Sequence, residues 1–124
     1  MLKRVHTVKA PEAIGPYSQA VVWGDIVFTS GQIAINPTTG QVEADTIETQ
    51  TEQVMQNLKA VLEEAGTSME NAVKTTCFLK HMNDFTTFNA IYAKYFTGKP
   101  ARSCVAAKQL PKDVLVEVEV IAVR

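Results

Sequence analysis

The chain has 124 residues, of which 46% are hydrophobic and 20% charged, a balance typical of a soluble globular domain. Its formal net charge of −1 argues against a nucleic-acid-binding surface, because such surfaces are usually strongly basic. No apolar run is long enough to span a bilayer or to form a signal peptide. We therefore expect a single domain over residues 1–124, located in the cytoplasm, with neither a nucleic acid nor a membrane as its partner.

Three short strands are predicted in the first quarter of the chain. Residues 3–8 form a short alternating run, and residues 18–23 and 26–31 are rich in valine, isoleucine, phenylalanine and threonine. The pair Gly24-Asp25 between the second and third strands favours a two-residue hairpin turn. Two prolines and a glycine within residues 11–17 predict a loop after the first strand.

An exposed loop over residues 36–45 is followed by a predicted helix over residues 46–65. Asp45 or Thr46 can accept hydrogen bonds from the free amides of the first turn. Gly66 suits the C-terminal end of the helix, where a left-handed conformation costs glycine little. The apolar stripe of the helix consists of Val54, Leu58, Val61, Leu62 and Ala65.

A strand over residues 72–81 and a second helix over residues 84–96 are predicted next. Asn83 or Asp84 is expected to cap this helix, and Gly98 is expected to end it. The strand is expected to place Val73, Thr75, Cys77 and Leu79 on one side. The apolar face of the helix consists of Phe85, Phe88, Tyr92 and Phe96.

Two last strands, over residues 102–108 and 113–123, are joined by the turn Leu110-Pro111-Lys112-Asp113. The order βββαβαββ predicts an α+β fold, in which right-handed crossovers place both helices on one face of a mixed sheet. One face of the last strand is fully apolar and suits helix packing: Val114, Val116, Val118, Val120 and Ala122. The other face mixes charge with apolar side chains: Leu115, Glu117, Glu119, Ile121 and Val123. Such a face usually meets a partner, so we expect a homo-oligomer with sites at the seams between sheets; the alternative is a monomer that tolerates the mixed face.

Arg102 and Glu117 are the candidate chemical groups, because each places a charge in a predicted core strand. Arg102 could bind a carboxylate ligand through two parallel hydrogen bonds, or it could pair with Glu117 or Glu119 across neighbouring strands. Glu117 could orient or deprotonate a water molecule, or it could be an edge charge in a salt bridge. The sequence alone leaves both alternatives open.

Three further residues are candidates for a ligand cleft. Gly31, after Ser30, ends a strand where bare backbone could approach a ligand, although a glycine needed only for a turn is commoner. Tyr17 lies on a proline-stiffened loop and could donate its hydroxyl to a substrate, or it could simply pack.

Cysteine, histidine and glycine patterns point to no cofactor chemistry. Cys77 and Cys104 have no metal-type spacing, and Cys104 has no histidine nearby to activate it, so both are expected to be reduced and inert. Neither His6 nor His81 belongs to a motif, and no phosphate-binding glycine loop or nicotinamide fingerprint is present. A cofactor-free reaction or simple binding is what the residues support.

Several sequence blocks follow one another along nearly the whole chain: Ala13-Ile14-Gly15-Pro16-Tyr17-Ser18-Gln19, Phe28-Thr29-Ser30-Gly31-Gln32, Asn57 to Gly66, Asn83-Asp84-Phe85, Pro100-Ala101-Arg102-Ser103-Cys104-Val105, and Leu110-Pro111-Lys112-Asp113 leading into Val116-Glu117-Val118-Glu119. In this order they resemble the RidA/YjgF/YER057c/UK114 family of enamine/imine deaminases. The resemblance implies a chorismate-mutase-like fold with a mixed six-stranded sheet. It also implies a homotrimer in which three sheets form a central barrel with clefts between subunits.

The activity implied by the resemblance is the hydrolysis of 2-aminoacrylate, 2-iminopropanoate and 2-iminobutanoate to 2-oxo acids and ammonia, without a cofactor. Carried over by position, Arg102 and the backbone at Cys104 would bind the substrate carboxylate, and Glu117 would hold the attacking water. Tyr17, Ser30 and Gly31 would line the cleft. Asn89 matches another cleft residue, expected to be supplied across the subunit interface.

Two departures from the family pattern lie outside these residues. The segment Phe96-Thr97-Gly98-Lys99-Pro100 is shorter than in many members, which could reshape the cleft rim, and Lys108-Gln109 replaces a commoner Ala-Arg pair. Two other functions stay open at this point. One is a non-catalytic protein that binds 2-oxo acids and regulates a partner. The other is an endoribonuclease or translation inhibitor, against which the near-neutral charge and the lack of a histidine acid–base pair argue.

Overall fold

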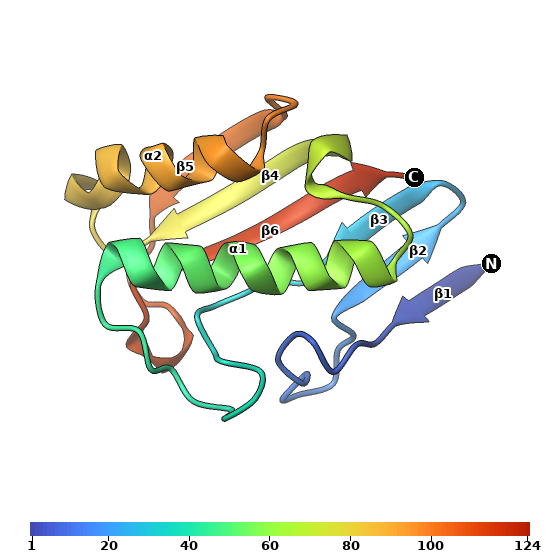
Figure 1. Ribbon diagram of the computed structural model, residues 1–124, viewed down its shortest axis with the longest axis horizontal. Coiled ribbons are helices and arrows are strands. Elements are labelled where there is room, and N and C mark those ends of the chain that lie inside the picture. Colours follow the sequence, from blue (N-terminus) through green and yellow to red (C-terminus); the bar gives the residue numbers. More distant parts are fainter.

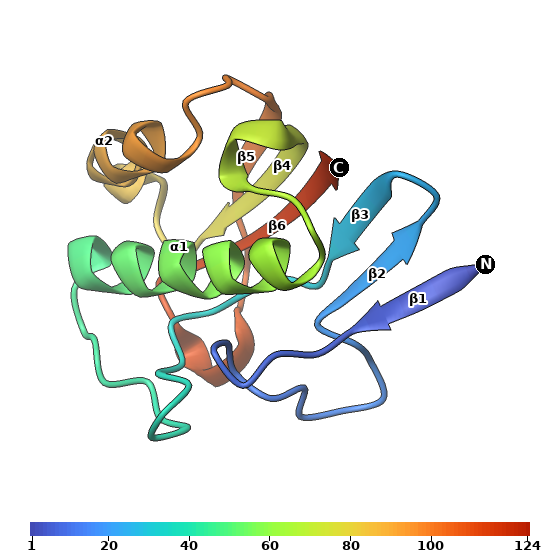
Figure 2. The same ribbon diagram turned by 45° about the vertical axis from the view of Figure 1, so that its right-hand side comes forward.

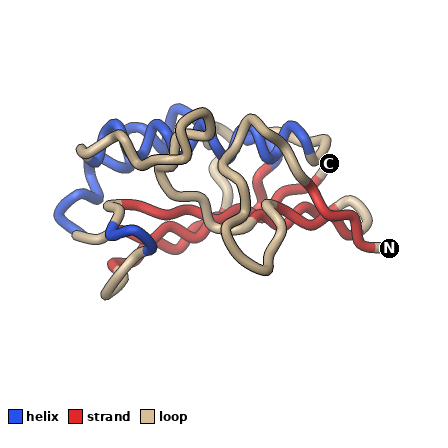
Figure 3. Tube along the Cα trace, turned by 90° about the horizontal axis from the view of Figure 1, so that it is seen from below, coloured by secondary structure: helices blue, strands red, loops and turns tan.

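The computed structural model covers residues 1–124 and has the expected α+β architecture (Figure 1). A mixed six-stranded sheet has the order β1-β2-β3-β6-β4-β5, in which only β4 and β5 run parallel. Both helices lie on one face of the sheet, which leaves the other face open (Figure 3). The elements are β1 (Leu2–Val5), β2 (Ala20–Trp23), β3 (Ile26–Thr29), α1 (Ile47–Glu64), β4 (Ala72–Leu79), α2 (Phe85–Tyr95), β5 (Ala101–Ala106) and β6 (Val116–Val123).

Helix α1 begins and ends as its sequence predicts. The Thr46 hydroxyl accepts a hydrogen bond from the Thr49 amide (3.1 Å), and the Thr49 hydroxyl accepts one from the Thr46 amide (3.3 Å). This reciprocal capping box makes Thr46, and not Asp45, the cap. Gly66 follows the helix with φ +88° and donates its amide to the Glu63 carbonyl (3.1 Å).

The core lies between the sheet and the two helices (Figure 2). Helix α1 contacts β3, β6 and α2, and its apolar stripe is buried as predicted. From β6, the alternate residues Val116, Val118, Val120 and Ala122 are all buried against the helices. Neither helix combines the length and hydropathy that crossing a membrane requires.

All six strands are shorter than predicted: the first, for example, ends at Val5 and not at residue 8, and the third ends at Thr29 and not at residue 31. Two strand predictions need a further correction. Strand β6 begins at Val116 rather than at residue 113, because residues Pro111–Asp113 form a short 3-10 turn. In β4, Thr75, Cys77 and Leu79 are buried together as predicted, but Val73 is 48% exposed. A shift of register against β6 between Ala72 and Lys74 breaks the alternation there and turns Val73 outward.

The ends of α2 also differ from the prediction. Asp84 occupies the N-cap position, but its side chain caps no amide, and the helix ends at Tyr95 with Phe96 as its C-cap. Gly98 therefore lies beyond the helix end and does not terminate it. A Cβ atom at Gly98 would lie 2.7 Å from the carbonyl oxygen of Glu70, so this glycine permits close backbone packing instead.

Candidate functional site

A cavity of about 580 Å³ lies between the loop that follows β1, the extension of β3, and the start of β6. It gathers four of the residues predicted for the cleft, Tyr17, Ser30, Gly31 and Glu117, together with Glu119. Gln32 continues β3 beside β6 through two hydrogen bonds with the Val118 backbone (2.9 and 3.2 Å). This pairing brings Gly31 alongside Glu117.

Gly31 is required for close approach and not for a turn. Its φ lies outside the left-handed region that favours glycine. A Cβ atom built at this position would overlap the carboxylate of Glu117. The bare backbone of Gly31 therefore makes room for the Glu117 side chain at the wall of the cavity.

The half-buried Glu117 carboxyl has a pKa raised above the ordinary glutamate value. Burial is the larger cause, because it penalises the charged form, and the nearby negative charge of Glu119 is the second. A raised pKa makes the carboxylate a better proton acceptor near neutral pH. Glu12 also lines the cavity, and no lysine or arginine does, so the cavity is acidic within one chain.

The loop that carries Tyr17 is tied down by a buried side chain. Gln19 accepts from the Thr7 amide (2.7 Å) and donates to the carbonyls of Thr7 (3.1 Å), Ala10 (3.3 Å) and Pro11 (2.7 Å). The Ser30 hydroxyl donates to the Ser18 carbonyl at 2.6 Å. Gln19 was not singled out by the sequence reasoning, because one polar residue at a predicted strand end carries no signal of its own.

Arg102 lies elsewhere, on the helix side of the sheet. Its Nη1 donates to Asn89 Oδ1 at 2.6 Å, and its guanidinium carbon lies 4.7 Å from the ring centre of Tyr92 and 5.3 Å from that of Phe85. A smaller cavity of about 380 Å³ opens beside Arg102 and Asn89. The ion pairs of the chain are His6–Glu12 and Lys80–Asp113, so the guanidinium has no carboxylate partner.

The predicted alternative of an ion pair between Arg102 and Glu117 or Glu119 is wrong within one chain. Strands β5 and β6 are not neighbours, because β4 lies between them. The side chains also lie on opposite faces, since Arg102 stacks on α2 whereas Glu117 alternates with the helix-facing valines of β6. One chain thus presents two separate groups of candidate residues, which we call half-sites. One is the acidic cavity with Glu117, and the other is the Arg102 guanidinium, which has no carboxylate partner.

Asn89 and Cys104 belong to the half-site of Arg102. Asn89 was expected to arrive across an interface, but in one chain it binds Arg102 directly, so the two residues enter any shared cleft together. Cys104 pairs in register with Cys77, and both thiols are free. Burial raises the pKa of Cys77 to about 12 and also raises that of Cys104, which disfavours a thiolate nucleophile.

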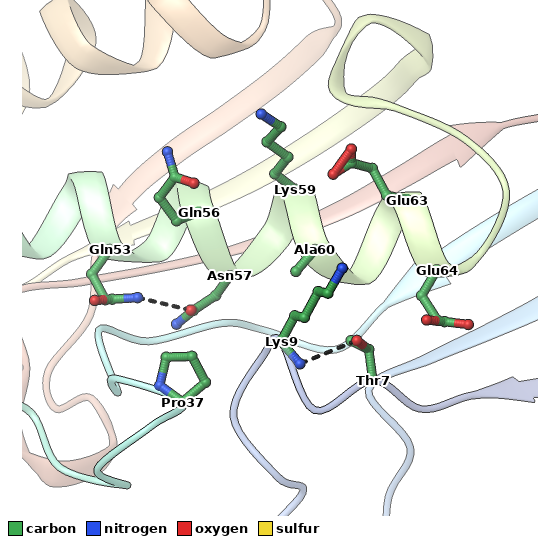
Figure 4. A pocket seen from close by; sticks show the side chains of 10 residues that line it. All are labelled: Thr7, Lys9, Pro37, Gln53, Gln56, Asn57, Lys59, Ala60, Glu63 and Glu64. Carbon is green, nitrogen blue, oxygen red and sulfur yellow. Dashed lines mark hydrogen bonds between the residues drawn. The ribbon is translucent and has the colours of Figure 1, made fainter.

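A third cavity, of about 540 Å³, runs along the outer side of α1 and contains none of the predicted site residues (Figure 4). The buried Asn57 lies at its floor and accepts from Gln53 Nε2 (2.9 Å). Its Nδ2 donates to the carbonyls of Ile33 (3.1 Å) and Ile35 (2.9 Å), two residues that line the acidic cavity. Asn57 thus links α1 to the wall of that cavity, which the sequence reasoning did not anticipate.

The chain matches a sequence family described as Endoribonuclease L-PSP over residues 7–124. It is 51% identical, over all of its length and 99% of the other chain, to a protein from Escherichia coli K12 named 2-iminobutanoate/2-iminopropanoate deaminase. Its fold superposes with a TM-score of 0.97 on a Rid-family protein of unknown function from Yersinia pestis, 49% identical with full coverage of both chains. It superposes with a TM-score of 0.93 on E. coli TdcF with bound serine, which is 45% identical with 98% of each chain covered.

These matches span essentially the whole sequence and the whole fold, and they agree with the blocks that carry the resemblance. The chain belongs to the RidA/YjgF/YER057c/UK114 family.

Proposed function

We propose that the protein is a cofactor-free deaminase that hydrolyses 2-aminoacrylate, 2-iminopropanoate and 2-iminobutanoate to 2-oxo acids and ammonia. The reaction is supported by the full-length identity of 51% to a protein named for that activity. The substrate class rests on one observation, the unpaired guanidinium of Arg102, because such a planar cation suits bidentate recognition of a small carboxylate.

The complete site forms between subunits of a homotrimer in this proposal. The acidic cavity of one chain lacks a cation, and the half-site of Arg102 and Asn89 faces away from it. The open face of the sheet exposes large apolar side chains, Trp23 (58%), Phe28 (41%), Val105 (49%) and Val123 (42%), which supports burial against other copies. Packing three such faces into a barrel would let each acidic cavity receive Arg102 from a neighbour.

The chemistry then divides between the two half-sites. Arg102 and the backbone of Cys104 hold the substrate carboxylate, while Tyr17, Ser30 and Gly31 line the opposite wall. The enamine tautomerises to an imine, protonation makes its carbon electrophilic, and water held by Glu117 adds as Glu117 accepts a proton. The resulting carbinolamine loses ammonia and leaves the 2-oxo acid. Positioning and proton transfer are sufficient for this sequence of steps.

The proposal is tested by generating 2-aminoacrylate with a coupled serine dehydratase and following imine loss by semicarbazone trapping. Arg102→Ala should raise KM because it removes carboxylate binding, and Glu117→Gln should lower kcat because it removes the proton acceptor. Full activity in Arg102→Ala would refute the assigned role of Arg102. Tight 2-oxobutanoate binding without any acceleration of hydrolysis would instead indicate a regulatory binding protein.

RNA cleavage, which the family description names, has less support in this chain. His6 is hydrogen-bonded to Glu12 at 2.8 Å, at an exposed position, and neither His6 nor His81 lines the acidic cavity. RNA cleavage that persists after rigorous nuclease removal and disappears in Glu117→Gln would revive this function.

A further inference from the structure

Arg102 is held in place without being neutralised. Three residues of α2 on one helical face, Phe85, Asn89 and Tyr92, contact its guanidinium group, two through aromatic rings and one through an amide oxygen. None of these groups carries a negative charge. The positive charge of Arg102 is therefore fixed in direction and still available to a ligand.

The Tyr92 ring is itself fixed from several sides. Its hydroxyl shares a 2.7 Å hydrogen bond with the Thr75 hydroxyl, and both residues are buried. Its ring packs against Phe88 at 5.6 Å and Phe96 at 4.6 Å between ring centres.

Thr75 connects to both Tyr92 and Arg102, through a side-chain hydrogen bond to the first and strand pairing with the second. It is the residue of β4 that pairs in register with Arg102 of β5. The strand neighbour of the arginine thus anchors the aromatic ring on which the arginine rests. Movement of the guanidinium away from this orientation would require the ring, its buried hydrogen bond and its packing to adjust as well.

We propose that Tyr92, anchored by Thr75, is a positioning residue that preorganises Arg102 for binding the carboxylate of the substrate. This inference rests on the proposed function. A long arginine side chain ordinarily loses rotamer freedom when it grips a ligand, and that loss weakens binding. In this chain the contacts with Phe85, Asn89 and Tyr92 already restrict the rotamers of Arg102 before the ligand binds. Because the carboxylate is held alike in the ground state and the transition state, the effect of Tyr92 falls on KM and on ligand affinity rather than on kcat.

The test compares Tyr92→Leu, which removes the ring, with Tyr92→Phe, which removes only the anchor. The chain has three arginines, so the Nε resonance of Arg102 can be assigned and its order measured by NMR relaxation. We expect Arg102 to become mobile in Tyr92→Leu, with a smaller change in Tyr92→Phe. Affinity for 2-oxobutanoate should fall about 2- to 12-fold in Tyr92→Leu, the range expected when binding must immobilise one rotamer-rich side chain, with kcat for imine hydrolysis nearly unchanged.

Tyr95→Phe is the matched control, since it removes a hydroxyl from the same helix that bonds Glu52 and Gln56 and not Thr75. Should Tyr92→Leu fail to fold, Phe85→Leu removes the other, less buried ring under Arg102 and is read in the same way. An Arg102 order parameter and ligand affinity in these variants equal to those of Tyr95→Phe would overturn the inference. A wild-type protein that neither binds 2-oxobutanoate nor hydrolyses imines would contradict the proposed function alone, because the NMR measurement needs no ligand.

Discussion

Burial, and second the negative charge of Glu119, disfavour the charged form of the Glu117 carboxyl, and together they raise its pKa above the ordinary glutamate value. The proposed mechanism needs the ionised form, so activity should fall as the pH drops through this raised pKa. Glu119→Gln removes the neighbouring charge and should move the acidic limb of the kcat/KM profile to lower pH. Profiles measured with imines from an amino-acid oxidase would check this, and an unmoved limb would show that Glu119 does not act on Glu117.

Gly31 offers a second test at this scale. A methyl group in Gly31→Ala would overlap the Glu117 carboxylate and push it from the cavity wall, while the backbone conformation suits alanine. We expect at least a tenfold loss of kcat, roughly 1.4 kcal/mol in barrier height, with the melting temperature little changed. Adding Gly31→Ala to Glu117→Gln should cost little more, because contacting residues that act together are not additive. Fully additive losses would show that Gly31 acts on something other than Glu117.

At the scale of elements, Asn57 joins helix α1 to the segment that lines the acidic cavity. Asn57→Ala would leave the buried carbonyls of Ile33 and Ile35 without this donor, which should lower the free energy of unfolding by about 1–3 kcal/mol. Gln53→Ala removes a more exposed partner of the same amide and should cost less than about 0.5 kcal/mol. Urea denaturation of the two variants measures the difference, and equal losses would contradict the role given to Asn57.

Local sequence signals predict where the helices and strands lie, but they predict less well how the strands pair with one another. The helical spacing and the capping box specify α1, and strict alternation specifies the buried face of β6. The exposure of Val73 depends on a bulge between Ala72 and Lys74, and no glycine or other turn residue in the sequence indicates that bulge.

The candidate site shows the same limit. The blocks around Gly31 and Glu117 predicted which residues meet in the acidic cavity. The idea that Arg102 could pair with Glu117 assumed that strands joined by a short turn lie side by side, the usual arrangement. Here β4 lies between them. Side chains alternate between the two faces along each strand, and only comparison with the face that the helices cover shows that the two charges lie on opposite faces of the sheet.

At the scale of the whole molecule, two half-sites on opposite faces predict complementation between inactive chains. In the proposed trimer, Arg102→Ala and Glu117→Ala proteins should each be nearly inactive at substrate concentrations far below the raised KM of Arg102→Ala. Subunits mixed after denaturation and refolded should regain about a quarter of the wild-type activity, for random assembly with each site shared by two chains. Each variant refolded alone is the control. A mixture as inactive as its components would show that each site draws on a single chain.

The opposed placement of Arg102 and Glu117 has a last consequence for how the protein responds to its own concentration. A lone chain carries every reactive group and yet cannot bring the two charges to one ligand. Under the proposed function, the specific activity would therefore drop upon dilution below the dissociation constant of the assembly, where that of a self-sufficient monomer would stay constant.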